Sequence, residues 1–240
     1  VVHQAVHRVE RVVVITHALK KFFVTHGVSE GKLLVAPDAV AYEQFALAET
    51  KEEARARTGL PQDATIVMYA GHLYAWKGVD TLAEAARLLP EALVVFVGGT
   101  DRDRQRFTER YKMHKTIRVI PTQPHAEIPH YLRSADVLVL PNTAREPLSS
   151  LYTSPMKLFE YLASGRPVVA SDLPSLREVV DESCAVFARP DDPKDLARAI
   201  RSSIADRTSS DHKARAAQRI AMQHTWEARA RLVLEMVKKS

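Results

Sequence analysis

Short apolar runs alternate with longer amphipathic stretches along most of the chain. From Thr65 onward the apolar runs have the length of single strands, and polar and apolar residues mix in the stretches between them. This alternation is typical of a parallel sheet that is covered by helices. The predicted strands are Thr65–Ala70, Leu93–Val97, Ile117–Ile120, Asp136–Leu140, Pro167–Ser171 and Ala185–Phe187. The pattern therefore predicts an α/β fold with a Rossmann-like, doubly wound parallel sheet.

Apolar residues at helical spacing predict the helices between and after these strands. The predicted helices are Asp80–Leu89, Ile128–Ser134, Ser154–Ser164, Asp192–Ala205, Asp211–Gln223 and Trp226–Lys238. The polar stretch Asp206–His212 is expected to connect two of them. In the last helix, Trp226, Ala230, Val233 and Val237 form one stripe, which predicts a face that packs on a core.

Residues 1–48 depart from this pattern. They offer one strand (Val12–Ile15), one helix (Ala18–His26) and one short strand (Leu33–Ala36), which is too little for an independent core. The segment is expected to pack on something else. Because Val1 is not an initiator methionine and no signal peptide follows, the chain is expected to be part of a longer protein.

Composition narrows the classes of function. The formal net charge of +5 comes from 34 basic and 29 acidic residues without a long basic block, which suits an anionic small ligand or surface. No aromatic and basic stripe or zinc-ligand spacing supports nucleic-acid binding. No apolar run approaches the roughly 18 residues of a membrane-spanning helix. The single cysteine, Cys184, cannot form an internal disulfide, which fits a reducing compartment. A soluble, cytoplasmic protein is expected.

Ligands of open parallel sheets bind beyond the carboxyl ends of the strands. After the first predicted strand, the segment Gly71–Gly78 reads GHLYAWKG and enters a helix. Its glycines allow close backbone approach, and Lys77 adds a charge near the helix N-terminus, where an anion could be held. A structural turn with a solvated lysine is the alternative interpretation.

A second candidate site lies at the start of the helix predicted near Ser154. Thr153 or Ser154 can cap it, Pro155 suits its first turn, and Gly165 suits the position past its end. The free amides at this end are candidates to hold a phosphate.

The same helix presents Lys157 and Glu160 on one stripe, while Leu158, Phe159 and Leu162 face the predicted core. Lys157 could contact a phosphate, and Glu160 could accept two hydrogen bonds from a ribose diol. The alternative is a solvated face on which Lys157 and Glu160 form an ion pair.

In order and separation, the two segments resemble glycosyltransferase family 4. In that family a strand is followed by Gly-Arg-Leu, three residues and Lys-Gly, which Gly71–Gly78 matches. A carboxylate-rich helix before Gly-x-Pro-Val-Val-Ala comes later, and residues 158–170, LFEYLASGRPVVA, match it. Ser134–Val137, followed by Leu140 and Pro141, matches the segment between them. The resemblance covers about Val12 to Val237.

The resemblance implies a GT-B fold in which this chain supplies the C-terminal, donor-binding half. Residues 1–48 would be the end of an N-terminal acceptor domain plus a linker, and residues 49–240 the donor-binding domain. The donor would be a nucleotide sugar, transferred with retention and without a metal or cofactor to a glycan or lipid-linked acceptor. The missing N-terminal domain would bind that acceptor, so no catalytic residue is identified here, and this chain alone is expected to be nearly inactive.

The resemblance also assigns individual residues. The donor diphosphate would be bound by Gly71, His72, Lys77, Ser154, Met156 and Lys157. The ribose would be bound by Glu160, the nucleobase by Thr122, and the donor sugar by Glu146, Ser150 or Tyr152. Two positions depart from the family: His72 stands where the family has arginine, and Tyr152 stands at the first glutamate of the family's Glu-x7-Glu motif. Tyr152 puts the contact to the transferred sugar in doubt, while His72 could either donate a hydrogen bond to phosphate or only cap the end of the strand.

Two other classes remain open at this point. One is a Rossmann-like binding module that has lost catalysis, and the other is a nucleotide-sugar epimerase of the same architecture. The lack of a G-x-G-x-x-G after any predicted strand argues against a dehydrogenase. The last helix and residues 1–40 are expected to expose apolar surface that favours self-association. The inner face of a membrane is one expected location.

Overall fold

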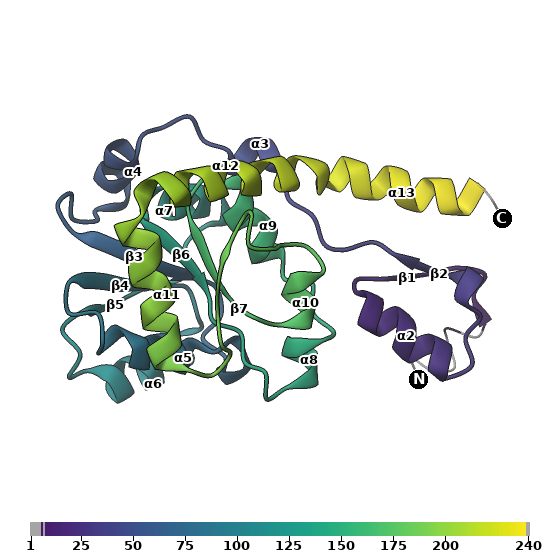
Figure 1. Cartoon of the computed structure of the whole chain (residues 1–240), viewed down its shortest axis with the longest axis horizontal. Helices are drawn as coiled ribbons and strands as arrows, with labels where there is room; N and C mark the ends of the chain where they lie inside the picture. Colours follow the sequence, from purple (N-terminus) through teal and green to yellow (C-terminus); the bar gives the residue numbers. More distant parts are fainter. Residues whose placement is uncertain (1–5, 7, 239–240) are drawn as a thin grey trace.

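A six-stranded sheet in the order β5-β4-β3-β6-β7-β8, with every neighbouring pair parallel, forms the centre of the molecule (Figure 1). The computed structural model describes residue 6 and residues 8–238, so Val1 lies outside the described part. The strands are β3 (Thr65–Ala70), β4 (Ala92–Val97), β5 (Ile117–Ile120), β6 (Val137–Leu140), β7 (Val168–Ser171) and β8 (Val186–Ala188). The predicted doubly wound α/β fold is confirmed.

Strand boundaries agree with the prediction to within a residue, and two of the shifts have a clear cause. Pro167 has no amide proton to give to a ladder, so β7 begins at Val168. Asp136 precedes β6 because its carboxylate accepts a hydrogen bond from the amide of Ile66, at 2.7 Å, at the start of the neighbouring strand.

Helices cover both faces of the sheet and divide the core into two clusters. On one face α5 (Val79–Ala86) packs against α11 (Pro193–Ala205), and α6 (Asp101–Tyr111) adds Phe107 and Tyr111 to the same cluster. On the other face α9 (Met156–Ala163) packs against α12 (Arg207–Gln223), with α7 (Ile128–Ser134) beside them. Leu158, Phe159 and Leu162 of α9 are fully buried, as predicted.

Among the helices that were not predicted, the two longest, α4 (Lys51–Thr58) and α6, are almost wholly polar. The helix α6 buries only Phe107 and Tyr111. The helix α4 buries only Ala54 and the Arg55 side chain, and a Thr50–Glu53 capping box starts it. Neither segment has the apolar stripe on which the prediction relied. The remaining short helices are α3 (Tyr42–Phe45), α8 (Pro147–Ser150), α10 (Pro174–Arg177) and the 3₁₀ turns η1 (Glu30–Lys32), η2 (Ala75–Lys77) and η3 (His125–Glu127).

The prediction that Asp206–His212 is a connection between helices is wrong. The helix α11 ends at Ala205 and α12 begins at Arg207, with Asp206 alone between them. The Asp206 carboxylate caps α12 by accepting from the amide of Ser209 at 2.9 Å. The first turns of α12 are polar because they face outward, while Ser210 is buried.

The expected start of the α9 helix is also corrected. The helix begins at Met156, its N-cap position is Pro155, and no side chain caps it. Ser154 precedes the N-cap position, and its hydroxyl accepts a hydrogen bond from the Asp38 amide at 2.9 Å instead of one from the helix. The first amides of α9 are therefore open to another acceptor.

The N-terminal segment forms a small unit that rests on the larger body. Its parallel pair β1 (Val12–Val14) and β2 (Leu33–Val35) and its helix α2 (His17–Thr25) enclose a cluster of Val6, Val14, Val28 and Leu33. The amide of His17 donates to the Glu178 carboxylate at 2.9 Å. The small cluster and this contact agree with a segment too small to form a full core alone.

The last helix, α13 (Trp226–Lys238), runs past the body and above the N-terminal unit (Figure 1). None of its described residues is buried, so the predicted core stripe of Trp226, Ala230, Val233 and Val237 is wrong for this structure. The side chain of Val237 is 57% exposed. Arg229 ties the start of the helix to the linker by donating to the carbonyl of Pro37 at 2.8 Å.

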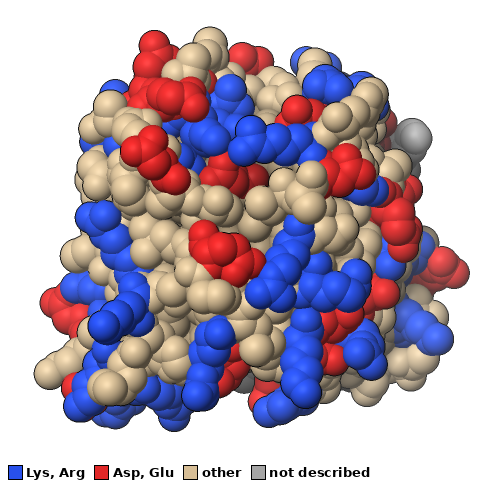
Figure 2. Space-filling model, turned by 60° about the vertical axis from the view of Figure 1, so that its left-hand side comes forward, with Lys and Arg blue, Asp and Glu red and all other residues tan. Residues whose placement is uncertain are grey.

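Charged side chains of both signs are interspersed over the side of the molecule that carries α4 (Figure 2). This distribution agrees with the sequence, which has no long basic block. Cys184 is buried and makes no disulfide. Within the part of the chain that the structure describes, none of the helices combines the length and the apolar character that crossing a bilayer requires.

Candidate functional site

The loop after β3 and the start of α9 are in direct contact. The Lys157 ammonium donates to the Tyr69 hydroxyl at 2.7 Å, and that hydroxyl donates to the carbonyl of His72, also at 2.7 Å. A side chain at Gly71, which has a φ of 143°, would place its Cβ only 2.4 Å from the Lys157 nitrogen. Glycine is therefore required where the two segments meet.

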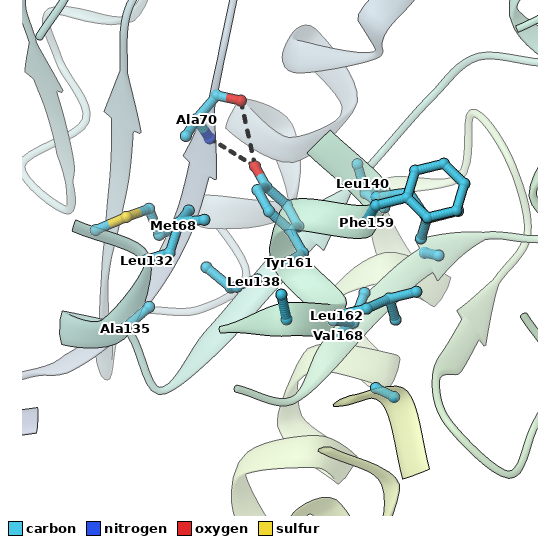
Figure 3. Packing of buried hydrophobic residues seen from close by; sticks show 14 of the residues in the cluster. Met68, Ala70, Leu132, Ala135, Leu138, Leu140, Phe159, Tyr161, Leu162 and Val168 are labelled. Atoms are coloured by element: carbon cyan, nitrogen blue, oxygen red, sulfur yellow. Dashed lines mark hydrogen bonds between the residues drawn. The ribbon is translucent and has the colours of Figure 1, made fainter. Parts of the chain in front are cut away.

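The next turn of α9 holds the end of β3 as well. The Tyr161 hydroxyl accepts a hydrogen bond from the Ala70 amide at 2.7 Å and lies 3.3 Å from the Ala70 carbonyl, to which it donates (Figure 3). Tyr161 is fully buried among Met68, Leu138 and other apolar residues. These bonds fix the carboxyl end of β3 relative to α9.

Gly78 fixes the other end of the same loop. Its φ of 72° is left-handed, and a Cβ there would lie 1.7 Å from the carbonyl oxygen of Pro141. The loop after β3 therefore rests on the backbone that follows β6. This contact sets the position of Lys77, the last residue of η2.

Lys77 and Lys157 bring two positive charges to this edge of the sheet. Burial lowers the pKa of Lys77 to about 8, and its ammonium lies 3.6 Å from the centre of the Trp76 ring. Burial, and then the charge of Lys77, hold the pKa of Lys157 well below its usual value, while Glu160 opposes the shift. An anion between the two ammonium groups would relieve both effects.

Glu160 lies one turn further along α9, with its side chain 14% exposed. Burial raises the pKa of its carboxyl, and His125 opposes the shift from a distance of 3.3 Å between Nε2 and Oε1. The hydrogen-bond partners of the two charged residues are thus His125 for Glu160 and Tyr69 for Lys157. No ion pair joins Lys157 to Glu160 among the contacts of the described residues, so that alternative is not supported.

The sequence did not single out His125, Tyr69 or Asp191. Asp191 has a φ of 59°, and its carboxylate accepts from the Thr143 hydroxyl at 2.6 Å and from the Ala144 amide at 2.9 Å. It lines a small cavity of about 160 Å³ together with Gly78 and Glu146. For His125 and Asp191, a polar residue in a loop after a strand was the only sequence signal, and Tyr69 lies within β3.

The residues expected near the transferred sugar separate into two groups. Glu146 lies beside Gly78, and the Ser150 hydroxyl donates to the Glu146 carbonyl at 3.2 Å. The Tyr152 ring instead packs on Phe22 of α2, with the ring centres 6.0 Å apart. Tyr152 therefore contacts the N-terminal unit.

Three further residues were expected to bind the nucleotide, and the structure describes their positions. The His72 ring is exposed and stacks on Tyr74, with the ring centres 4.9 Å apart. The Thr122 hydroxyl donates to the carbonyl of Gly99 at 2.8 Å, which leaves its oxygen able to accept. Met156 is 45% exposed at the uncapped start of α9.

The fold and this site define a Rossmann-like domain of the GT-B type, with its ligand edge at the carboxyl ends of the strands. The sequence pattern of the family "Glycosyl transferases group 1" matches residues 50–221. The chain therefore belongs to the group 1 glycosyl transferases, which are glycosyltransferase family 4, and corresponds to their C-terminal domain.

Individual relatives agree with this family. A D-inositol 3-phosphate glycosyltransferase of Streptomyces avermitilis is 30% identical over 218 residues, which are 83% of this chain and 45% of that protein. The chain thus spans less than half the length of this curated relative.

Solved structures agree with the fold. HepE of Anabaena, in complex with UDP, superposes with a TM-score of 0.84 at 20% identity, covering 98% of this chain and 65% of HepE. The C-terminal domain of LpcC from Francisella tularensis has a TM-score of 0.63 at 20% identity, covering 77% of this chain and 97% of that domain.

Proposed function

We propose that this chain is the donor-binding domain of a retaining glycosyltransferase and holds a nucleotide sugar at the carboxyl edge of its sheet. The observation that carries the proposal is the contact between the loop after β3 and the start of α9 through Lys157, Tyr69 and His72. This contact brings together two cations and an uncapped helix end, which together favour an anionic ligand.

In this proposal the donor diphosphate lies between Lys77 and the start of α9. The amides of Met156 and Lys157 and the Lys157 ammonium donate to its oxygens, and Gly71 and His72 line the approach. The Ser154 hydroxyl, which accepts from the Asp38 amide, keeps its proton to donate to an oxygen of the diphosphate. As the bond to the sugar breaks, these donors stabilise the negative charge that develops on the leaving diphosphate, without a bound metal.

The contacts of the ribose, the nucleobase and the sugar are proposed from the positions of the polar side chains. The Glu160 carboxylate accepts from both ribose hydroxyls in place of its contact with His125. Thr122 and the backbone at Gly99 contact the nucleobase. Glu146 and Ser150 are better placed for the sugar than Tyr152, which packs on α2.

The relatives narrow the substrates to be tested. HepE was solved with UDP, so uridine nucleotides are the first donors to examine. The acceptor, a glycan or lipid-linked molecule, is bound in this proposal by an N-terminal domain of which residues 1–48 are the final part, with residues 49–240 as the donor domain. The reaction is assigned to the cytoplasm, including the inner face of a membrane.

Replacing Glu160 tests the proposal most selectively. Glu160→Ala is expected to weaken nucleoside-diphosphate binding by about 1.5–3 kcal/mol, since charge-assisted hydrogen bonds to the ribose are lost, and Glu160→Gln should recover part of this. Calorimetric titration with UDP, GDP and ADP measures the effect. Glu127→Ala is the matched control, because Glu127 lies in nearby η3 but pairs with Arg57 at 2.9 Å.

The outcome also separates the competing functions. Unchanged nucleotide affinity in a folded Glu160→Ala variant would show that Glu160 does not bind the ribose. Binding of none of the nucleotides by the unaltered chain would favour a binding module that has lost its donor site. A bound donor that is epimerised rather than transferred would favour the epimerase.

A further inference from the structure

A second group of basic side chains lies at the opposite edge of the sheet, where β3, β6 and β7 begin. The Arg55 side chain is only 2% exposed and donates to the Asp136 carboxylate at 2.7 Å and to the Ser134 carbonyl at 3.0 Å. The Lys51 ammonium bonds the other oxygen of Asp136 at 2.8 Å. With the Ile66 amide also bonded to it, Asp136 has little capacity for a further cation.

Two more guanidinium groups adjoin this cluster and bond to neutral carbonyls. Arg166 donates through Nε to the Arg133 carbonyl at 2.8 Å. Arg133 donates to the carbonyls of Glu49, at 2.7 Å, and Ser164, at 3.4 Å. Lys51 and Arg55 thus share the Asp136 carboxylate, whereas the bonds given for Arg133 and Arg166 are to carbonyl groups.

The pKa of Arg166 is lowered first by burial and then by neighbouring positive charge. Burial, and then the charge of Arg133, lower its pKa to about 10; Arg55 acts in the same sense. The carboxylates of Asp136 and Glu52 oppose the shift without cancelling it. A negative charge placed here would be favourable.

A small cavity opens beside these groups. It has a volume of about 160 Å³ and is lined by Lys51, Asp136, Arg166 and, from the first two turns of α12, Arg207 and Asp211. This volume is well below the roughly 300 Å³ at which pockets for drug-sized ligands begin, so a single ionic group fits better than a nucleotide. Lys51, the first residue of α4, lines the cavity, and charged side chains of both signs are interspersed over the side of the molecule that carries α4 (Figure 2).

The other groups at this cavity are already paired or exposed. The Ser210 hydroxyl donates to the Ser203 carbonyl at 2.7 Å and lies 3.2 Å from the Ser203 hydroxyl. Arg207 and Asp211 are exposed, so Arg207 can turn toward a ligand while the Asp211 carboxylate can turn to solvent. Arg166 is the fixed cation and Arg207 the movable one.

We propose that this cavity binds a phosphate group, at a site separate from the donor site and independent of the proposed transferase function. Guanidinium groups recognise phosphate through paired, charge-assisted hydrogen bonds, and Arg166 and Arg207 border the cavity together with Lys51. The phosphate belongs to a free phosphate compound or to the headgroup of an acidic lipid, since both present the same chemistry to the site.

The first experiment measures thermal unfolding of the whole chain in the presence of inorganic phosphate. Potassium chloride at equal ionic strength is the control. Phosphate is expected to raise the melting temperature of the unaltered chain and of the exposed-surface control Arg102→Gln. Arg166→Gln should weaken phosphate binding by about tenfold, and Arg207→Gln by several-fold. Because Arg207 is exposed, its replacement tests the site even if Arg166→Gln does not fold.

The donor site also attracts phosphate, so the variant Lys77→Met separates the two sites. Stabilisation that persists in Lys77→Met and decreases in Arg207→Gln supports the cavity. Stabilisation that is lost in Lys77→Met and kept in Arg207→Gln would assign the phosphate to the donor site and overturn the proposal. No stabilisation beyond that given by chloride would overturn it as well.

Vesicles identify the source of the phosphate. The chain is sedimented with phosphatidylcholine vesicles that contain or lack phosphatidic acid. Binding that requires phosphatidic acid, decreases in Arg207→Gln and is displaced by inorganic phosphate supports a lipid headgroup. Stabilisation by phosphate without vesicle binding supports a soluble phosphate compound. Vesicle binding that is equal in Arg207→Gln and the unaltered chain, without phosphate stabilisation, contradicts the site.

Discussion

The pKa values of Lys77 and Lys157 are lowered by their surroundings in the folded domain. Burial lowers the pKa of both side chains, and the charge of Lys77 lowers the pKa of Lys157 further. Such an arrangement is costly for the free domain and becomes favourable when a diphosphate arrives. The two lysines are therefore better explained as parts of a binding site than as stabilising contacts.

This arrangement makes donor binding sensitive to pH. The pKa of Lys77 is about 8 in the free domain, so Lys77 is protonated below that pH and loses its charge above it. Because a bound diphosphate favours the protonated form, nucleoside-diphosphate affinity should be constant near pH 7 and fall by up to about tenfold as the pH rises well above 8.

Calorimetry across this pH range measures the effect, and Lys77→Met provides the control. The variant should bind more weakly at pH 7 and show a flatter profile. An unaltered chain with constant affinity up to pH 9.5 would mean that Lys77 does not contact the ligand.

Sequence reasoning identified Lys77, Lys157 and Glu160 by residue type and spacing. It could not find the hydrogen-bond partners of Lys157 and Glu160. Tyr69 is 88 residues from Lys157 in sequence and His125 is 35 residues from Glu160, so these pairs meet only after the chain has folded. The direction of Tyr152 likewise depends on a ring contact with Phe22 in a distant helix. Spacing along one helix carries no information on such contacts.

At the scale of elements, the turns that join strands to helices decide the geometry of the site. Strands of the central sheet were predictable since apolar runs mark them, whereas α4 and α6 have too few apolar residues to show a helical period. The start of α12 was missed for the same reason. The prediction of helix starts from caps failed at Ser154, whose hydroxyl bonds to a residue far away in sequence.

Gly78 offers a test of these turns, with Gly59 as its matched control. Both glycines are left-handed, with φ of 72° and 66°, but a Cβ at Gly59 would meet no atom within 4 Å, whereas one at Gly78 would collide with the Pro141 carbonyl. Gly59→Ala should cost about 1–2 kcal/mol of unfolding free energy from backbone strain alone. Gly78→Ala should cost about 1–3 kcal/mol more.

Urea unfolding of both variants gives the difference directly, provided that the slopes of the transitions agree. Equal losses for the two variants would show that the loop after β3 does not rest on the Pro141 backbone. A second readout is nucleotide affinity, which should fall in Gly78→Ala and stay unchanged in Gly59→Ala, because only Gly78 positions Lys77.

At the scale of the whole molecule, local stability should differ between the central sheet with its covering helices and the two appendages, α13 and the N-terminal unit. The central strands are fully buried, whereas α13 has no buried residue and the N-terminal unit encloses only a small cluster. Exposed apolar side chains on α13, among them Leu234 and Val237, keep the prediction of self-association open.

Native-state hydrogen exchange measures this division. Amides of β3, β4 and β6 should exchange only by global unfolding, and those of α13 by local opening at a free energy at least about 3 kcal/mol lower. The experiment should be run over a range of protein concentrations. Protection of α13 that increases with concentration would support self-association through that helix, and protection equal to that of β3 at all concentrations would show that α13 belongs to the body.

The central claim is that one diphosphate bridges the loop after β3 and the start of α9. The most direct test is a crystal structure of this chain with the nucleoside diphosphate that binds most tightly in the titrations. The account predicts diphosphate oxygens within hydrogen-bond distance of the Lys77 ammonium and the Met156 amide, with the ribose hydroxyls on Glu160. A nucleotide bound anywhere else on the domain, with Glu160 still on His125, would contradict the account.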